Sequence, residues 1–77
     1  MEIDLRELKL NEQLKKVTEI IDSDFNEASI ITNEEAIIKI IPMQILDKKI
    51  KCQMKYKDNY WKINLITKEV IWNTKNH

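Results

Sequence analysis

The stretches KIKCQMKYK (49–57), DN (58–59) and YWKINLI (60–66) follow one another directly and predict a β-hairpin. Apolar and polar residues alternate before and after the DN pair, which is the period of strands with one buried face. Asp and Asn tolerate a positive φ, so this pair can form a two-residue turn in a chain that has no glycine. The hairpin is the best-defined part of the fold.

The register of this hairpin follows from its loop. With a loop at 58–59, Tyr56 faces Trp61 and Met54 faces Ile63, so apolar residues pair with apolar residues. The faces of the two strands therefore agree with each other. One face is apolar and the other is basic.

A second hairpin is expected directly afterwards. If 67–68 is a turn and 69–73 is a strand, Val70 faces Leu65 and Trp72 faces Ile63. The aromatic residues Tyr56, Trp61 and Trp72 then share the core face, and we interpret them as packing residues and not as the lining of a ligand pocket.

The front of the chain predicts a helix. Leu10, Leu14, Val17 and Ile21 recur at helical spacing, and we place a helix at 11–23 with Asn11 as its N-cap.

Leu5 and Leu8 fall on the opposite side of the same helical wheel, so we expect a break near 9–11. Residues 1–10 are then either an extended arm or a short separate helix.

Residues 28–46 read as two further strands, Ala28–Thr32 and Ala36–Leu46, with Pro42 at an edge or a bulge. The predicted fold is α+β: an N-terminal helix packed on a four- or five-stranded antiparallel meander sheet. One domain spans 1–77, with the sheet at 28–73 and a tail at 74–77. At 77 residues its core is small.

The net charge of zero conceals a division. Residues 1–35 carry four basic and ten acidic residues, a net charge of −6, whereas residues 36–77 carry nine lysines and three acidic residues, a net charge of +6. Such a field can steer a partner. The single cysteine excludes an internal disulfide, so we expect a reducing cytoplasmic setting. The frequent Lys, Ile and Asn residues suggest an A+T-rich bacterial or phage genome.

The sequence gives little support to catalysis. The lack of glycine excludes phosphate loops, dinucleotide fingerprints and nucleophile elbows. Cys52 is in phase with the apolar face and His77 is the last residue, so this pair is a poor nucleophile site and cannot build a zinc site. We predict no catalytic residue, metal or cofactor. The densest carboxylates are interpreted as a solvated acidic surface: Glu19, Asp22, Asp24 and Glu27.

The basic sheet face is the candidate binding site. Lys55 faces Lys62 across the hairpin, an arrangement of like charges that a sheet does not need. Ile38 and Ile40 fall on the same side in the simplest register, unless a bulge at Pro42 turns them inward. The candidate partner-binding residues are Lys49, Lys51, Lys55, Lys57, Lys62, Tyr60, Ile38 and Ile40.

We expect a non-enzymatic module that binds an acidic protein, for example a phage-borne or accessory inhibitor or regulator of a larger bacterial protein. One alternative is nucleic-acid binding through the same lysines, with Tyr60 stacking on a base. Another is a self-assembling protein or homodimer in which acidic and basic faces meet. The lysines could also serve only to keep the sheet soluble and its edges unpaired.

Overall fold

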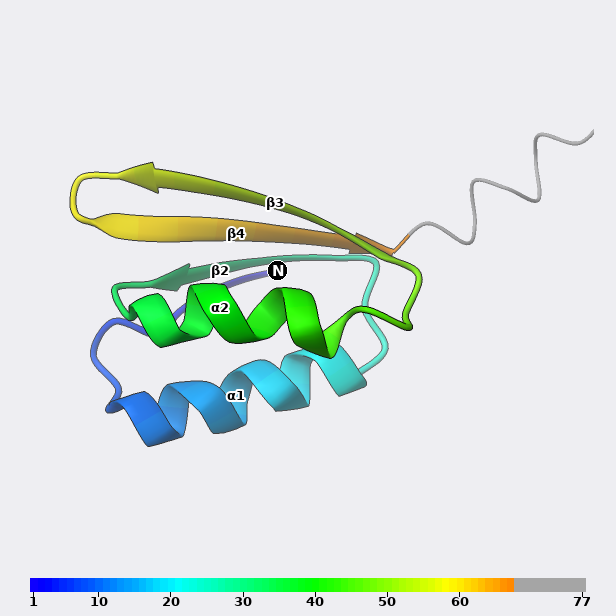
Figure 1. The fold of residues 1–77 in the computed structure, drawn as a ribbon, viewed down its shortest axis with the longest axis horizontal. Coiled ribbons are helices and arrows are strands. Elements are labelled where there is room, and N and C mark those ends of the chain that lie inside the picture. Colours follow the sequence, from blue (N-terminus) through cyan, green and yellow to red (C-terminus); the bar gives the residue numbers. More distant parts are fainter. Residues whose placement is uncertain (68–77) are drawn as a thin grey trace, which may run out of the picture.

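The computed structural model describes residues 1–67, which form two helices and a four-stranded mixed sheet (Figure 1). In chain order the elements are β1 (Glu2–Asp4), α1 (Leu10–Asp22), β2 (Glu27–Thr32), α2 (Glu35–Gln44), β3 (Ile50–Lys57) and β4 (Tyr60–Thr67). The α+β class is confirmed. Because helices and strands interleave, the predicted helix followed by an antiparallel meander is wrong.

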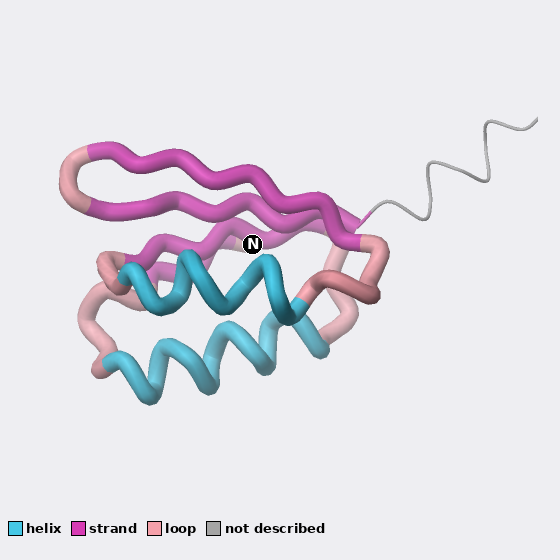
Figure 2. Tube along the Cα trace, in the orientation of Figure 1, coloured by secondary structure: helices cyan, strands magenta, loops and turns pink. Residues whose placement is uncertain are grey.

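The strand order in the sheet is β1-β2-β4-β3, so β4 lies between β2 and β3 (Figure 2). β1 runs parallel to β2, whereas β2 and β3 both pair antiparallel with β4. The parallel pair is possible because α1 carries the chain back between the two strands. Within the described residues, β1 and β3 are the two edge strands of the sheet.

The predicted β3–β4 hairpin is confirmed, including its register. Tyr56 pairs with Trp61 and Met54 with Ile63. Both residues of the 58–59 turn have a positive φ, 56° and 71°, as a two-residue turn with the twist of a hairpin requires.

The second predicted hairpin lies almost entirely outside the described residues. Thr67 is the last residue of β4, and the predicted strand at 69–73 follows it. Within the described sheet, Leu65 pairs with Cys52 of β3 on one side and with Ala28 of β2 on the other. β4 is therefore a central strand with neighbours on both sides.

The N-terminal residues, which the sequence left open, are extended at their start, where Glu2–Asp4 form β1. Ile3 pairs with Ile30, and the Leu5 backbone N–H donates a hydrogen bond of 2.8 Å to the Ile31 carbonyl oxygen. Leu5 is buried, which explains why it lies out of phase with the following helix.

The predicted helix is confirmed to within one residue at each end, as α1 begins at Leu10 and ends at Asp22. Its predicted cap is wrong, because the N-cap residue is Lys9 and not Asn11. The Glu12 carboxylate accepts a hydrogen bond of 3.2 Å from the Lys9 backbone N–H, which is half of a capping box.

The predicted strand Ala36–Leu46 is wrong, since α2 occupies this stretch. The side chains of Ile37 and Ile41 are buried, and their spacing of four residues belongs to one helix face. Pro42 lies inside the helix, near its C-terminal end, and marks neither an edge nor a bulge. Because proline has no N–H, the Ile38 carbonyl oxygen lacks its usual helical donor, and the helix ends two residues after the proline.

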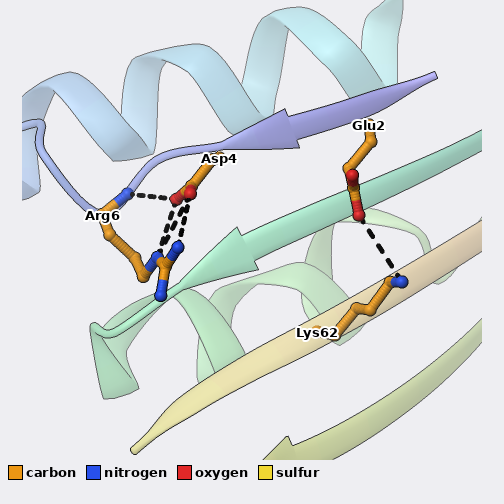
Figure 3. Close-up of polar contacts among 4 residues, drawn as sticks. All are labelled: Glu2, Asp4, Arg6 and Lys62. Carbon is orange, nitrogen blue, oxygen red and sulfur yellow. Dashed lines mark hydrogen bonds and ion pairs between the residues drawn. The ribbon is translucent and has the colours of Figure 1, made fainter. Parts of the chain in front are cut away.

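The hydrophobic core lies between the two helices and one face of the sheet. α1 and α2 lie on the same side of the sheet, and Figure 3 shows both of them behind the strands. The buried apolar residues are Leu5, Val17, Ile20, Ile21, Ala28, Ile30, Ile37, Ile41, Ile63 and Leu65. Neither described helix has the length and apolar character needed to cross a membrane.

A polar pair is enclosed at the edge of this core. Gln13 of α1 and Thr32 of β2 are fully buried, and the Thr32 hydroxyl donates a hydrogen bond to the Gln13 side-chain oxygen. The Gln13 amide in turn donates to the Leu8 carbonyl oxygen at 3.0 Å. These bonds satisfy the buried polar atoms and tie α1 to β2.

Because β4 lies in the centre of the sheet, we expect truncation of its buried Ile63 side chain to lower the stability of the fold considerably. Ile63→Ala is expected to lower the free energy of unfolding by about 2–5 kcal/mol, because it leaves a cavity beneath both neighbouring strands. Met43→Ala, at a side chain that is 68% exposed, is the control and should change it by less than about 0.5 kcal/mol. Urea denaturation measures both, and equal effects would contradict this core.

The 58–59 turn predicts a specific intolerance. Asn59→Val is expected to cost about 1–2 kcal/mol, because a β-branched residue is strained at positive φ. Asn59→Gly suits the same conformation and should keep stability within about 1 kcal/mol of the parent. Thermal unfolding of the two variants gives the comparison, and a valine variant as stable as the glycine variant would rule out this turn geometry.

Candidate binding face

Both described helices lie on one side of the sheet, and the side chains drawn in Figure 3 project from the opposite face. Strand alternation places every second residue on this outer face. Across the sheet from β1 to β3, one row reads Glu2, Ser29, Asn64, Gln53 and the next reads Asp4, Ile31, Lys62, Lys55. Glu2 and Asp4 therefore lie at the β1 edge and the lysines toward the β3 edge, while the exposed Glu27 of β2 lies opposite Ile66 on the same face.

Three exposed lysines follow the outer face of β3. Lys51, Lys55 and Lys57, called the lysine strip from here on, alternate with the core-facing residues of the strand. Lys49 is exposed in the loop just before it. No ion pair within residues 1–67 involves any of these four lysines, so their charges face solvent in the described part of the chain.

Lys62 differs from the strip, although it lies directly opposite Lys55 as predicted. Its amino group is 3.5 Å from a carboxylate oxygen of Glu2 on β1, an ion pair that spans β2 (Figure 3). Both side chains are about half exposed, so the pair contributes little stability. It does lower the charge repulsion between Lys62 and Lys55.

Arg6 forms a second cluster on the outer face. Its guanidinium makes two-pronged contact with the Asp4 carboxylate, with distances of 2.9 Å and 2.7 Å from Nε and Nη2 (Figure 3). The same guanidinium lies 4.7 Å from the centre of the Tyr60 ring, in a cation–π contact. These hydrogen bonds from Arg6 hold the pKa of Asp4 below its usual value.

Two of the predicted site residues are therefore already engaged within the chain. Lys62 is paired with Glu2, and one face of Tyr60 is covered by Arg6. Acidic and basic residues are not separated onto different faces at the N-terminus. Glu2 and Asp4 share the outer face with the lysines, because β1 joins the sheet as a parallel strand beside β2.

Ile38 and Ile40 do not border the lysines. Both belong to α2 and pack partly against the core on the helix side of the sheet. The apolar residues of the outer face are Ile31 and Ile66, both half-buried, and Ile66 pairs directly with Lys51. Sequence reasoning could have found Ile66 from the predicted hairpin register, since it falls in phase with Lys62.

The aromatic pair at the end of the hairpin lies on the helix side, as predicted, but is not enclosed. The rings of Tyr56 and Trp61 are 4.8 Å apart, and 60% of Tyr56 is exposed. Trp72 lies outside the described residues. The β3–β4 hairpin therefore presents apolar surface on its helix side as well as charge on its outer face.

The cysteine and the acidic residues near the end of α1 were the other side chains with possible chemistry in the sequence. Burial raises the pKa of the Cys52 thiol, which disfavours its reactive form. Within residues 1–67, no three His, Cys, Asp or Glu side chains are placed to hold a metal ion. Asp22 pairs with Lys48 at 3.8 Å, and the other acidic residues near the end of α1 are exposed. His77 lies outside the described residues.

Comparisons with known proteins add no further constraint on this face. No family model matches the chain, and no curated protein sequence or solved structure matches it either. The arrangement itself suits the binding of carboxylates, because it offers several unpaired lysines on one face beside half-buried apolar residues.

The Asp4–Arg6 contact predicts a pH dependence. The Asp4 carboxyl should titrate below its ordinary pKa of 3.8, and Arg6→Gln should raise this pKa toward 3.8. Since the pKa is lower in the folded state, the contact stabilises the fold above the ordinary pKa and loses its effect as the pH falls through the folded value. The chemical shift of the Asp4 carboxyl carbon, followed by NMR as the pH is changed, measures this pKa. Lys15→Gln on α1 is the control, and an unchanged Asp4 pKa in Arg6→Gln would contradict the contact.

Proposed function

We propose that this chain is a small non-enzymatic binding module that docks an acidic protein through the outer face of its sheet. The observation that carries the proposal is the lysine strip: three of the four outer-face residues of one edge strand are exposed lysines, without an ion pair in the described chain. An inhibitor or regulator of a larger protein is the role that best suits so small a module.

Neighbouring residues support docking of a protein. Ile66 lies beside Lys51, and Ile31 lies beside Lys62, so apolar groups are interspersed with the charges. Protein interfaces combine apolar contacts with a polar, charged rim, and the charges set orientation and association rate. Glu2 and Asp4 at the opposite edge of the sheet are paired with Lys62 and Arg6, so the unpaired positive charge of this face lies along β3, where we expect an acidic partner to dock.

Nucleic acid is a less favoured partner for the same face. Tyr60, the aromatic residue expected to stack on a base, has Arg6 over its ring. Glu2 and Asp4 also pair with Lys62 and Arg6 on this face, so only the lysines of β3 are left to contact phosphates. Fluorescence anisotropy with single-stranded and duplex DNA and RNA at low salt tests this alternative, and binding that weakens steeply with salt would replace the proposal.

The proposal predicts that reversing the lysine strip changes which proteins the chain captures. Tagged parent protein and a Lys51/Lys55/Lys57→Glu variant are compared by pull-down from a bacterial lysate. Proteins that bind the parent and not the variant should be acidic, and their capture should weaken as salt is raised.

The matched control is Lys15/Lys16/Lys39→Glu, which reverses three exposed lysines on the helices. It should keep the partners of the parent. Circular dichroism and urea denaturation establish that both variants fold. Identical partners from the parent and the strip variant would refute docking through this face.

A further inference from the structure

β3 is an edge strand in the described sheet. It has eight residues, and its only described strand neighbour is β4. An edge strand presents backbone N–H and C=O groups that a further strand can pair with. The side of β3 that faces away from β4 is called the free edge below.

The turn geometry determines which backbone groups face the free edge. Lys57 and Tyr60 flank a two-residue loop, so they form the hydrogen-bonded pair that closes the hairpin. Hydrogen-bonded and non-hydrogen-bonded pairs then alternate along an antiparallel ladder. It follows that the outward-pointing backbone groups are those of Ile50, Cys52, Met54 and Tyr56.

The side chains along the free edge differ between the two faces. The outer face carries the lysine strip, whose side chains are exposed. The helix side carries Ile50, Cys52 and Met54, which are half-buried, and Tyr56, which is 60% exposed. A strand laid along this edge would therefore meet positive charge on one face and incompletely covered apolar surface on the other.

We propose that the free edge of β3 binds an extended segment of an acidic protein by antiparallel strand addition, and that acidic and apolar residues alternate in this segment. Its acidic side chains lie opposite the lysine strip, and its apolar side chains cover Met54 and Tyr56. Backbone hydrogen bonds supply affinity and the alternation supplies specificity. This inference rests on the proposed function and specifies the form of the partner.

A second copy of the chain fits this edge poorly. Antiparallel pairing of two β3 strands centred on Gln53 sets Lys51 of one copy opposite Lys55 of the other, and like charges directly opposite are destabilising. The acidic strand β1 of a second copy has only three residues, and its carboxylates already contact Lys62 and Arg6. Charge complementarity therefore favours a different, acidic protein.

The test uses the full chain and a blocked, dye-labelled peptide of alternating glutamate and valine, matched in length to β3. In antiparallel addition the valines face the helix side, so their N–H groups point toward β3 and those of the glutamates point away. N-methylation of the valines is expected to weaken binding by at least about tenfold, because several backbone hydrogen bonds are lost together. N-methylation of the glutamates is the matched control. It should leave the affinity within about threefold of that of the unmodified peptide, a smaller change than the tenfold loss expected for the valines.

A peptide of the same composition, with its glutamates and valines in separate blocks, separates the two proposals. Equal binding of the block and alternating peptides, with no effect of valine methylation, would overturn strand addition and leave charge-based docking in place. If no acidic peptide binds the parent more tightly than it binds Lys51/Lys55/Lys57→Glu, both proposals fail. Strand addition would also be overturned if sedimentation shows that the unliganded chain dimerises and that the Lys51/Lys55/Lys57→Glu substitutions change this dimerisation.

Discussion

The two-sided pairing of β4 is the constraint on which the rest of this structure depends. β4 pairs along its length with β3 through the 58–59 turn and with β2 through a register that joins Ile63 to Ile30. The chain must therefore cross from β2 to β3 without pairing the two strands, and α2 makes this crossing on the helix side. With β4 in the centre, β3 lies at the edge of the sheet. Its side chains therefore have a neighbouring strand on one side only within the described residues.

The arrangement of charge follows from the same topology. β1 joins the sheet at the opposite edge, so Glu2 and Asp4 lie on the outer face at the other end of each row from the lysine strip. Three strand spacings of about 4.8 Å separate the two edges, which exceeds the Debye length of about 8 Å at physiological ionic strength. Glu2 therefore neutralises Lys62, whereas the lysines of β3 have no ion-pair partner in the described chain, and the nearest acidic residue in their rows is Glu27, two strands from Lys51.

Sequence reasoning succeeded where one local pattern decided the structure. The alternation on both sides of 58–59 gave the hairpin and its register, and the spacing of Leu14, Val17 and Ile21 gave α1. It failed at α2, because isoleucine favours strands intrinsically, whereas burial of Ile37 and Ile41 against the sheet selects a helix.

The remaining errors required information from elsewhere in the chain. Nothing local to residues 2–4 indicates a parallel partner 27 residues later, and β1 is too short to show a period. The same limit applied to the prediction of the candidate site. The lysine strip was predictable from the hairpin, whereas the contacts of Arg6 with Asp4 and Tyr60 depend on β1 entering the sheet.

Amide hydrogen exchange of the free protein, resolved by NMR along β3, tests the central claim that this strand is an edge available to a partner. The account predicts alternation: the N–H groups of residues 51, 53, 55 and 57, which point toward β4, are protected, and those of residues 50, 52, 54 and 56 exchange rapidly. Strong protection at every residue of β3 would mean that this edge is already occupied in the free protein, which would contradict the account.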